Sequence, residues 1–402
     1  MASAKDTRDA RAAWFGLGLG AAAVAGAGAG LAAHFARRVL TPARKPESGV
    51  RVLAIEGEIG SPEGARLWLQ GPDVELAGRY SFIFDAESRA TQRAAGHARL
   101  GPVVDSAGTG RGLRVARQVL SVERGELRAG ARGRITGWWY TEPEQLGYEV
   151  RRVALPLPNG VGQGWVIRPE HSEPGRWAIH VHGRGALPEE TLRGVEPFAK
   201  AGVTSLVISY RNDPGAPAGL GGRYGLGLAE CDDVDAALGW ARGQGAERVT
   251  LVGWSMGGTA VVLAAGEGRN AELVDGLVLD SPALDWPGTL RHQARLAGLP
   301  LALAELAMLF LSQGVVRGAI AGARGTDFAR LGTTRLASLL RVPTLIHASA
   351  GDTYVPWRGS LRFAQLRPGL VRLRPASGQH VKMWNVDPEG WERETADFIA
   401  RL

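Results

Sequence analysis

A serine flanked by glycines follows a run of β-branched and apolar residues. The run that begins at Val249 leads into Gly253-Trp-Ser255-Met-Gly257, and a helical stretch follows. A sharp turn from strand to helix exposes such a hydroxyl, and it needs glycine on both sides because side chains there would collide with strand or helix. Fifty-seven glycines in 402 residues make the bare pattern unspecific, so the flanking strand and helix carry the prediction. Ser255 is the candidate nucleophile.

Two later segments could supply the partners of a nucleophilic serine. Asp352 lies in a loop after the apolar run that begins at Thr344, and His380 follows another predicted strand. The carboxyl ends of parallel strands meet at one edge of a sheet, so Ser255, Asp352 and His380 can converge there. A histidine oriented by a carboxylate can take the proton of a serine hydroxyl. Asp280 also ends a predicted strand and is the alternative acid, although its Asp-Ser-Pro context is typical of a turn.

A glycine-containing loop upstream could stabilise the charge that develops in acyl transfer. The carbonyl oxygen becomes negative in that chemistry, and two fixed backbone N–H groups are the usual donors to it. The strand-like run from His180 opens into Gly183-Arg184-Gly. We assign the two donors to the N–H groups of Arg184 and Met256, with Gly183 permitting a close approach. A loop that only turns the chain is the alternative.

Strand-like and helical segments alternate from residue 149 to the C-terminus. Predicted strands begin at residues 149, 164, 177, 204, 249, 276, 344 and 371, and helices are predicted near 189–201, 228–244, 259–266, 357–366 and 391–402. This alternation predicts an α/β domain over 149–402, with a mainly parallel sheet and helices on both faces. More than 60 residues separate the strands at 276 and 344, so we expect a helical cap at about 285–335.

Residues 149–402 resemble the α/β-hydrolase superfamily. The resemblance is carried by the loop at Gly183, Tyr210-Arg-Asn-Asp213, the turn at Ser255, and the segments of Asp352 and His380. These residues are similar to those of bacterial serine esterases, acyl-peptidases and dienelactone-hydrolase-like members. The resemblance implies the fold and a Ser-His-Asp triad, and it leaves the substrate open. Asn212 and Asp213 could contact substrate, but the Asn-Asp-Pro-Gly sequence that they begin is typical of a turn.

The first 148 residues predict two further parts. The 22 residues from Ala12 to Ala33 carry no charge and could span a bilayer. We therefore expect residues 1–45 to hold a single-pass N-terminal membrane anchor; a cleaved signal peptide and a soluble tail are the alternatives. Basic residues flank both ends, so the side of the membrane stays open. Short alternating runs broken by glycine predict a β-rich accessory module over 46–148.

Charge and cysteine content restrict the partners. The formal net charge is +7, and residues 286–375 hold twelve arginines against three acids. No basic run with interleaved aromatic residues is present, so we expect no nucleic acid partner. The basic cap could contact an anionic lipid or an acidic substrate, or simply present solvated arginines. A lone Cys231 and scattered histidines predict neither disulfide nor metal site, and no cofactor is implied.

The combined expectation is a membrane-anchored serine hydrolase that cleaves carboxylic esters through an acyl-enzyme. Its substrate would be a small ester or acyl compound. A serine peptidase or acyl-peptide hydrolase would use the same residues and is the first alternative. A phospholipid-directed acyl hydrolase and a non-catalytic binding protein with the same fold are the others.

Overall fold

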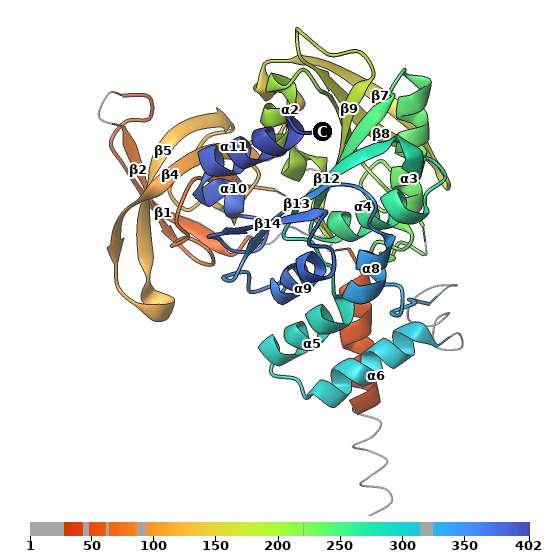
Figure 1. Cartoon of the computed structure of the whole chain (residues 1–402). Coiled ribbons are helices and arrows are strands. Elements are labelled where there is room, and N and C mark those ends of the chain that lie inside the picture. The colour runs from red at the N-terminus through yellow and green to blue at the C-terminus, as the bar shows by residue number, and fades with distance from the viewer. Residues whose placement is uncertain (1–27, 43–47, 62–63, 87–93, 220, 314–324) are drawn as a thin grey trace, which may run out of the picture.

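The computed structural model describes residues 28–42, 48–61, 64–86, 94–219, 221–313 and 325–402. Its two sheets form separate parts of the molecule, as Figure 1 shows. The smaller sheet closes into a barrel, and the larger one carries helices on both faces.

The N-terminal β-structure is a closed six-stranded barrel. Its strands run in the order β1-β2-β5-β4-β3-β6, and every paired neighbour is antiparallel. They are β1 (Val50–Glu56), β2 (Ala65–Gln70), β3 (Tyr80–Phe84), β4 (Gly96–Ala107), β5 (Arg114–Arg124) and β6 (Arg132–Thr136). Buried Val52, Leu67, Phe82 and Leu100 belong to the core inside it. Closure pairs the strand edges that an open sheet of this size would expose.

The larger sheet has eight strands in the order β14-β13-β12-β11-β9-β10-β8-β7. They are β7 (Glu149–Leu157), β8 (Gly160–Arg168), β9 (Arg176–Val181), β10 (Thr204–Ile208), β11 (Arg248–Trp254), β12 (Val274–Asp280), β13 (Thr344–Ser349) and β14 (Val371–Ala376). Five neighbouring pairs are parallel, whereas β8 runs antiparallel to β7 and β10. The sheet is therefore mixed. Only two residues join β7 to β8, which suffices for a hairpin but not for a parallel crossover.

Successive residues of the central strands face opposite layers of helices. Leu251 and Leu277 belong to the core under one layer, and their neighbours Val252 and Val278 belong to the core under the other. The first layer contains α3 (Glu230–Gly243), α4 (Met256–Glu267), α8 (Thr333–Leu339) and α9 (Arg358–Leu366). The second contains α2 (Glu196–Lys200), α10 (Met383–Val386) and α11 (Pro388–Ile399). Short 3-10 helices cover Gly110–Gly112, Pro143–Leu146, Pro188–Gly194 and Ala271–Leu273.

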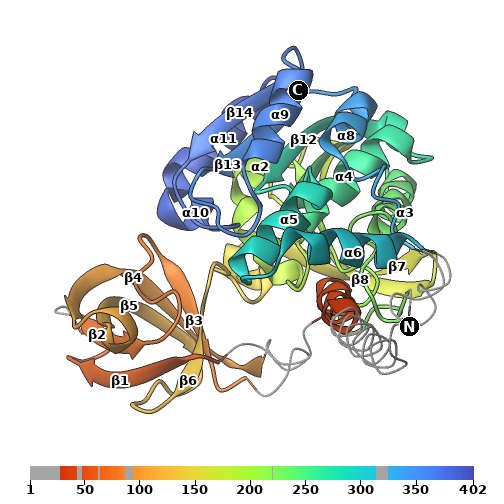
Figure 2. The ribbon, with the colours of Figure 1, turned by 90° about the horizontal axis from the view of Figure 1, so that it is seen from below.

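Two helices follow β12 where the cap is expected. α5 (Trp286–Leu296) and α6 (Leu301–Ser312) lie side by side, next to a helix formed by residues 28–40 (Figure 2). Residues 314–324 of the expected cap lie outside the described residues. Buried Ala307 and Leu311 of α6 join the core of the larger domain, so these helices pack onto it.

The prediction of a single-pass membrane anchor is corrected by the structure. In the described part of the chain, no helix is long and apolar enough to cross a membrane. Residues 12–27 of the predicted span lie outside that part, and its remaining residues begin the helix at 28–40. Ala32, Ala36 and Leu40, spaced four residues apart, are buried in the core of the larger domain. This apolar face is thus covered by protein.

Candidate active site

Ser255 occupies a strained turn between β11 and α4. Its φ of 53° and ψ of −114° lie outside the regions that L-residues prefer, at a cost of about 1–3 kcal/mol. Backbone bonds hold the turn: the Ser255 N–H donates to the Asp280 carbonyl at 2.9 Å, and the Ala283 N–H donates to the Ser255 carbonyl at 3.0 Å. The serine is fixed in this conformation from both sides.

The glycines around Ser255 leave no room for a side chain. A Cβ at Gly253 would lie 2.7 Å from the Cα of Gly258, and one at Gly257 would lie 2.3 Å from the Val181 carbonyl oxygen. A Cβ at Gly183, in the upstream loop, would lie 3.0 Å from the Cβ of Ser255. These contacts bring β11, the start of α4 and the end of β9 together around the serine.

His380 lies between Ser255 and Asp352. Its Nε2 is 2.8 Å from the Ser255 hydroxyl, and its Nδ1 is 2.7 Å from Asp352 Oδ2. The other carboxylate oxygen accepts the N–H groups of Tyr354 and Val355, each at 2.8 Å. Asp352 is thereby fixed, and it orients the imidazole with Nε2 toward the serine. The three side chains come from three separate loops, and the structure brings them into one chain of hydrogen bonds.

Asp280, the alternative acid, has other partners. Its Oδ2 accepts the indole N–H of Trp391 at 2.9 Å, and its Oδ1 accepts the Ser281 hydroxyl at 3.1 Å. Burial raises the pKa of this carboxyl to about 7, against the opposing influence of Arg193 and the two hydrogen bonds. The carboxyl hydrogen-bonded to His380 is that of Asp352.

Asp280→Asn should weaken the dependence of the free energy of unfolding on pH. The usual carboxyl pKa is 3.8, so the unfolded chain loses this proton near pH 4, whereas the folded protein keeps it to about pH 7. The folded state then binds more protons, and the free energy of unfolding falls as pH rises, by up to about 1.4 kcal/mol per unit. Urea unfolding at about pH 4.5 and pH 7 should show a smaller fall for Asp280→Asn than for the wild type. Equal falls would contradict this prediction.

Two backbone donors lie on segments that meet at Ser255: the N–H of Arg184 in the loop after β9, and the N–H of Met256 at the start of α4. The neighbouring N–H groups of Gly183 and Gly185 donate to Glu190 at 3.0 Å and to the Tyr224 hydroxyl at 2.9 Å. Within the described residues, no protein acceptor is bonded to the N–H of Arg184 or Met256. Two donors without a protein acceptor, on segments that meet at a nucleophile, are suited to binding an oxyanion.

A buried pair of His182 and Asp213 supports this loop, and it was not predicted from the sequence. His182 Nε2 lies 2.7 Å from Asp213 Oδ2, and the His182 ring stacks on Tyr210 with 4.2 Å between centroids. The same carboxylate accepts the Tyr210 N–H at 3.0 Å. Asp213 thus holds the loop, in agreement with a structural role for its turn. Glu190 was also missed, since nothing in its local sequence indicates that it folds back onto Gly183.

The side chain of Arg184 connects the site to the N-terminal helix. Its Nη1 donates to the Val39 carbonyl at 3.1 Å, and its Nη2 donates to the Tyr354 hydroxyl. The Tyr354 ring lies 5.1 Å from the His380 ring. The C-terminal end of the helix at 28–40 therefore contacts the residues that surround the candidate active site.

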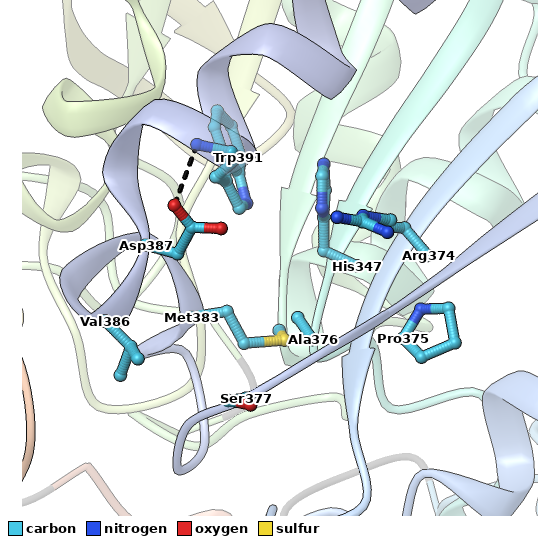
Figure 3. A pocket seen from close by; sticks show the side chains of 10 residues that line it. His347, Arg374, Pro375, Ala376, Ser377, Met383, Val386, Asp387 and Trp391 are labelled. Atoms are coloured by element: carbon cyan, nitrogen blue, oxygen red, sulfur yellow. Dashed lines mark hydrogen bonds between the residues drawn. The ribbon is translucent and has the colours of Figure 1, made fainter.

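A cavity of about 400 Å³ is lined by residues of β13, β14, α10 and α11, next to the loop that carries His380 (Figure 3). His347 and Trp391 stack in its wall, with 4.8 Å between ring centroids, and Ser377 and Met383 contribute the two ends of the loop. Burial lowers the pKa of His347 to about 3, so its ring is neutral at physiological pH. A second cavity of about 620 Å³ includes Asp352 in its lining. Among described residues, no group of three or more His, Cys, Asp or Glu side chains is placed to hold a metal.

Comparison with solved structures tests the fold. The esterase Pf2001 of Pyrococcus furiosus gives a TM-score of 0.50 at 21% sequence identity, covering 65% of this chain and 95% of that one. The C-terminal domain has the α/β-hydrolase fold. Two further matches have TM-scores below 0.5 and carry no argument. They are Est1E of Butyrivibrio proteoclasticus (TM-score 0.46, 16% identity, 62% and 99% coverage) and a serine hydrolase homologue of Coxiella burnetii (0.42, 17%, 62% and 96%).

The barrel lies outside the α/β-hydrolase domain. Residues 51–136, which make up most of it, match a family described as a domain of unknown function, DUF8805. A comparison with curated proteins found no match. The family match therefore supplies no activity for the barrel.

Proposed function

We propose that this protein is a serine hydrolase that cleaves carboxylic esters. The chain of hydrogen bonds from Asp352 through His380 to Ser255 is the observation that carries the proposal. His380 Nε2 takes the serine proton while Oγ attacks the ester carbonyl carbon. The Arg184 and Met256 N–H groups stabilise the oxyanion that forms.

The reaction then proceeds through an acyl-enzyme. His380 passes its proton to the departing alkoxide, which leaves as the alcohol. The same imidazole next takes a proton from water, whose oxygen attacks the acyl-enzyme carbonyl carbon. The imidazolium then returns that proton to Ser255 Oγ as the acid is released. The Asp352 carboxylate stabilises the imidazolium in both steps and keeps its own charge.

Esters are favoured as substrates because the compared Pf2001 structure is named an esterase. Its likeness to this chain is one of fold, so the bond cleaved needs a direct test. We expect a fluorophosphonate probe to label the full chain, and peptide mass spectrometry should locate the adduct on Ser255. It should then turn over p-nitrophenyl acetate or butyrate faster than matched aminoacyl p-nitroanilides.

Each other outcome selects a different function. Faster cleavage of the anilides would assign a peptidase or acyl-peptide hydrolase. A folded protein that is neither labelled nor active would overturn the proposal in favour of a non-catalytic binding protein. Activity that rises on anionic vesicles and falls with added salt would instead indicate a phospholipid substrate.

A further inference from the structure

The loop that carries His380 is held in a strained conformation. Val381, the next residue, has a φ of 51°, which is a genuine outlier for a β-branched side chain. Such strain persists only where neighbouring groups fix the backbone. Here the Val381 N–H donates to the Ser281 hydroxyl at 2.9 Å, and its carbonyl accepts Arg193 Nη2 at 2.6 Å.

Arg193 connects that carbonyl to the end of the barrel. Its Nη1 donates to the carbonyl of Gly137, directly after β6. The residue is 1% exposed, and its guanidinium lies 4.5 Å from the Trp254 ring, beside Ser255 in the sequence. Burying a guanidinium is costly, and here two carbonyls and an aromatic face partly offset the loss of water. One buried cation thus bridges the barrel and the backbone next to His380.

Asn385, in α10 directly after this loop, makes a second bridge. Its carbonyl accepts the Arg79 N–H at 2.8 Å, and its side-chain amide donates to the carbonyls of Arg79 at 2.9 Å and Gly137 at 3.1 Å. Asn385 is fully buried. The barrel approaches so closely that a Cβ at Gly78 would lie 2.2 Å from the Asn385 carbonyl oxygen. Backbone therefore meets backbone at this junction.

Charged groups extend the contact around the two bridges. Lys382 Nζ lies 2.5 Å from Asp73 Oδ2 of the barrel. The Arg79 guanidinium lies 4.6 Å from the Trp384 ring and 5.2 Å from the Trp139 ring. Four residues within the span 381–385 thus contact the barrel or its connecting segment, directly or through Arg193. In Figure 1, α10 lies beside the barrel.

We propose that the barrel is a positioning domain for His380, acting through Arg193 and Asn385 on residues 377–386, which comprise the His380 loop and α10. Neither residue touches the reacting atoms; both are positioning residues, and the proposal rests on the serine hydrolase function proposed above. Docking of the barrel holds the imidazole in line between Asp352 and Ser255. Loosening that contact leaves substrate binding intact but misaligns the base, so it lowers kcat and leaves KM unchanged.

Gly137→Ala in the full chain tests this directly. The added Cβ would lie 2.7 Å from Arg193 Nη1 and 2.8 Å from Asn385 Oδ1, so it disturbs both bridges at once. We expect kcat for p-nitrophenyl acetate to fall about 10- to 100-fold without a change in KM. Gly112→Ala is the matched control, because Gly112 also lies in the barrel and has no atom within 4 Å of the added methyl. It should keep the wild-type kcat.

A second readout does not depend on activity. The proton shared by His380 and Asp352 should give a downfield NMR signal that Gly112→Ala keeps and Gly137→Ala shifts or broadens. If the wild-type protein is neither labelled by the probe nor active on esters, the proposed function fails. The positioning role of the barrel is then decided by whether Gly137→Ala alone changes this NMR signal. If Gly137→Ala does not fold, Asp73→Asn can replace it, because Asp73 is half-exposed and its ion pair with Lys382 belongs to the same contact. It should change kcat and the NMR signal in the same direction as expected for Gly137→Ala, but by less. A folded Gly137→Ala protein with wild-type kcat and signal would overturn the proposal.

Discussion

Replacing Ser255 with alanine should reduce ester turnover by about 10⁴-fold or more, since removal of the nucleophile from such a triad leaves only the binding and oxyanion contributions. The only heavy atom removed is the hydroxyl oxygen, which lies 2.8 Å from His380 Nε2. Alanine keeps the Cβ, so the strained φ of 53° should cost the variant much the same as the wild type. Initial rates with p-nitrophenyl acetate at saturating substrate measure the effect.

Folding must be checked beside that loss of activity. Circular dichroism and the thermal midpoint of Ser255→Ala should match those of the wild type. Fluorophosphonate labelling should disappear in the variant and persist in Ser338→Ala, whose hydroxyl is exposed on α8 and donates to the Arg335 carbonyl. Residual turnover close to the wild-type rate would show that another group is the nucleophile.

Replacing Asp233 with alanine should destabilise the fold by about 3–5 kcal/mol, the usual cost of removing one partner of a buried ion pair. Asp233 is fully buried on α3 and accepts Nε and Nη2 of Arg211, each at 2.7 Å, in a bidentate pair. The same carboxylate accepts the Arg211 N–H at 3.0 Å. Alanine would leave a largely buried guanidinium without its counter-charge. Urea unfolding at neutral pH measures the loss.

A double variant separates the ion pair from the packing around it. Arg211→Met combined with Asp233→Leu removes both charges and keeps much of the buried volume. It should unfold at a higher urea concentration than Asp233→Ala, because no unpaired charge remains buried. If the double variant is the less stable, the bidentate pair itself contributes net stability.

The larger sheet was predictable because its strands are short apolar runs bounded by turns. All eight strands expected after residue 148 are present, and their ends agree to within a few residues. The helix expected at 189–201 is instead mostly a 3-10 turn over Pro188–Gly194 followed by the short α2. There Glu190 turns inward to Gly183 and Arg193 to Gly137, so tertiary contacts override the helical pattern.

The error at the N-terminus has a related cause. An Ala- and Gly-rich uncharged stretch satisfies the length rule for a membrane span, and hydropathy cannot show what covers its apolar face. In the structure, the Ala32, Ala36 and Leu40 face of the helix at 28–40 packs into the larger domain. The antiparallel placement of β8 was not predicted either, although the connection between β7 and β8 is too short for a parallel crossover.

By itself, the sequence determined the candidate Ser-Asp-His triad and the order of its residues, because the Ser255 turn, Asp352 and His380 each follow a recognisable strand. Only the tertiary structure decided that the carboxylate hydrogen-bonded to His380 is that of Asp352, since Asp280 ends β12 and Asp352 follows the neighbouring β13 at the same edge of the sheet. It also decided that the barrel docks onto the histidine loop. Arg193 and Asn385 carry no local signal for that contact, because their partners lie 56 and 248 residues away along the chain.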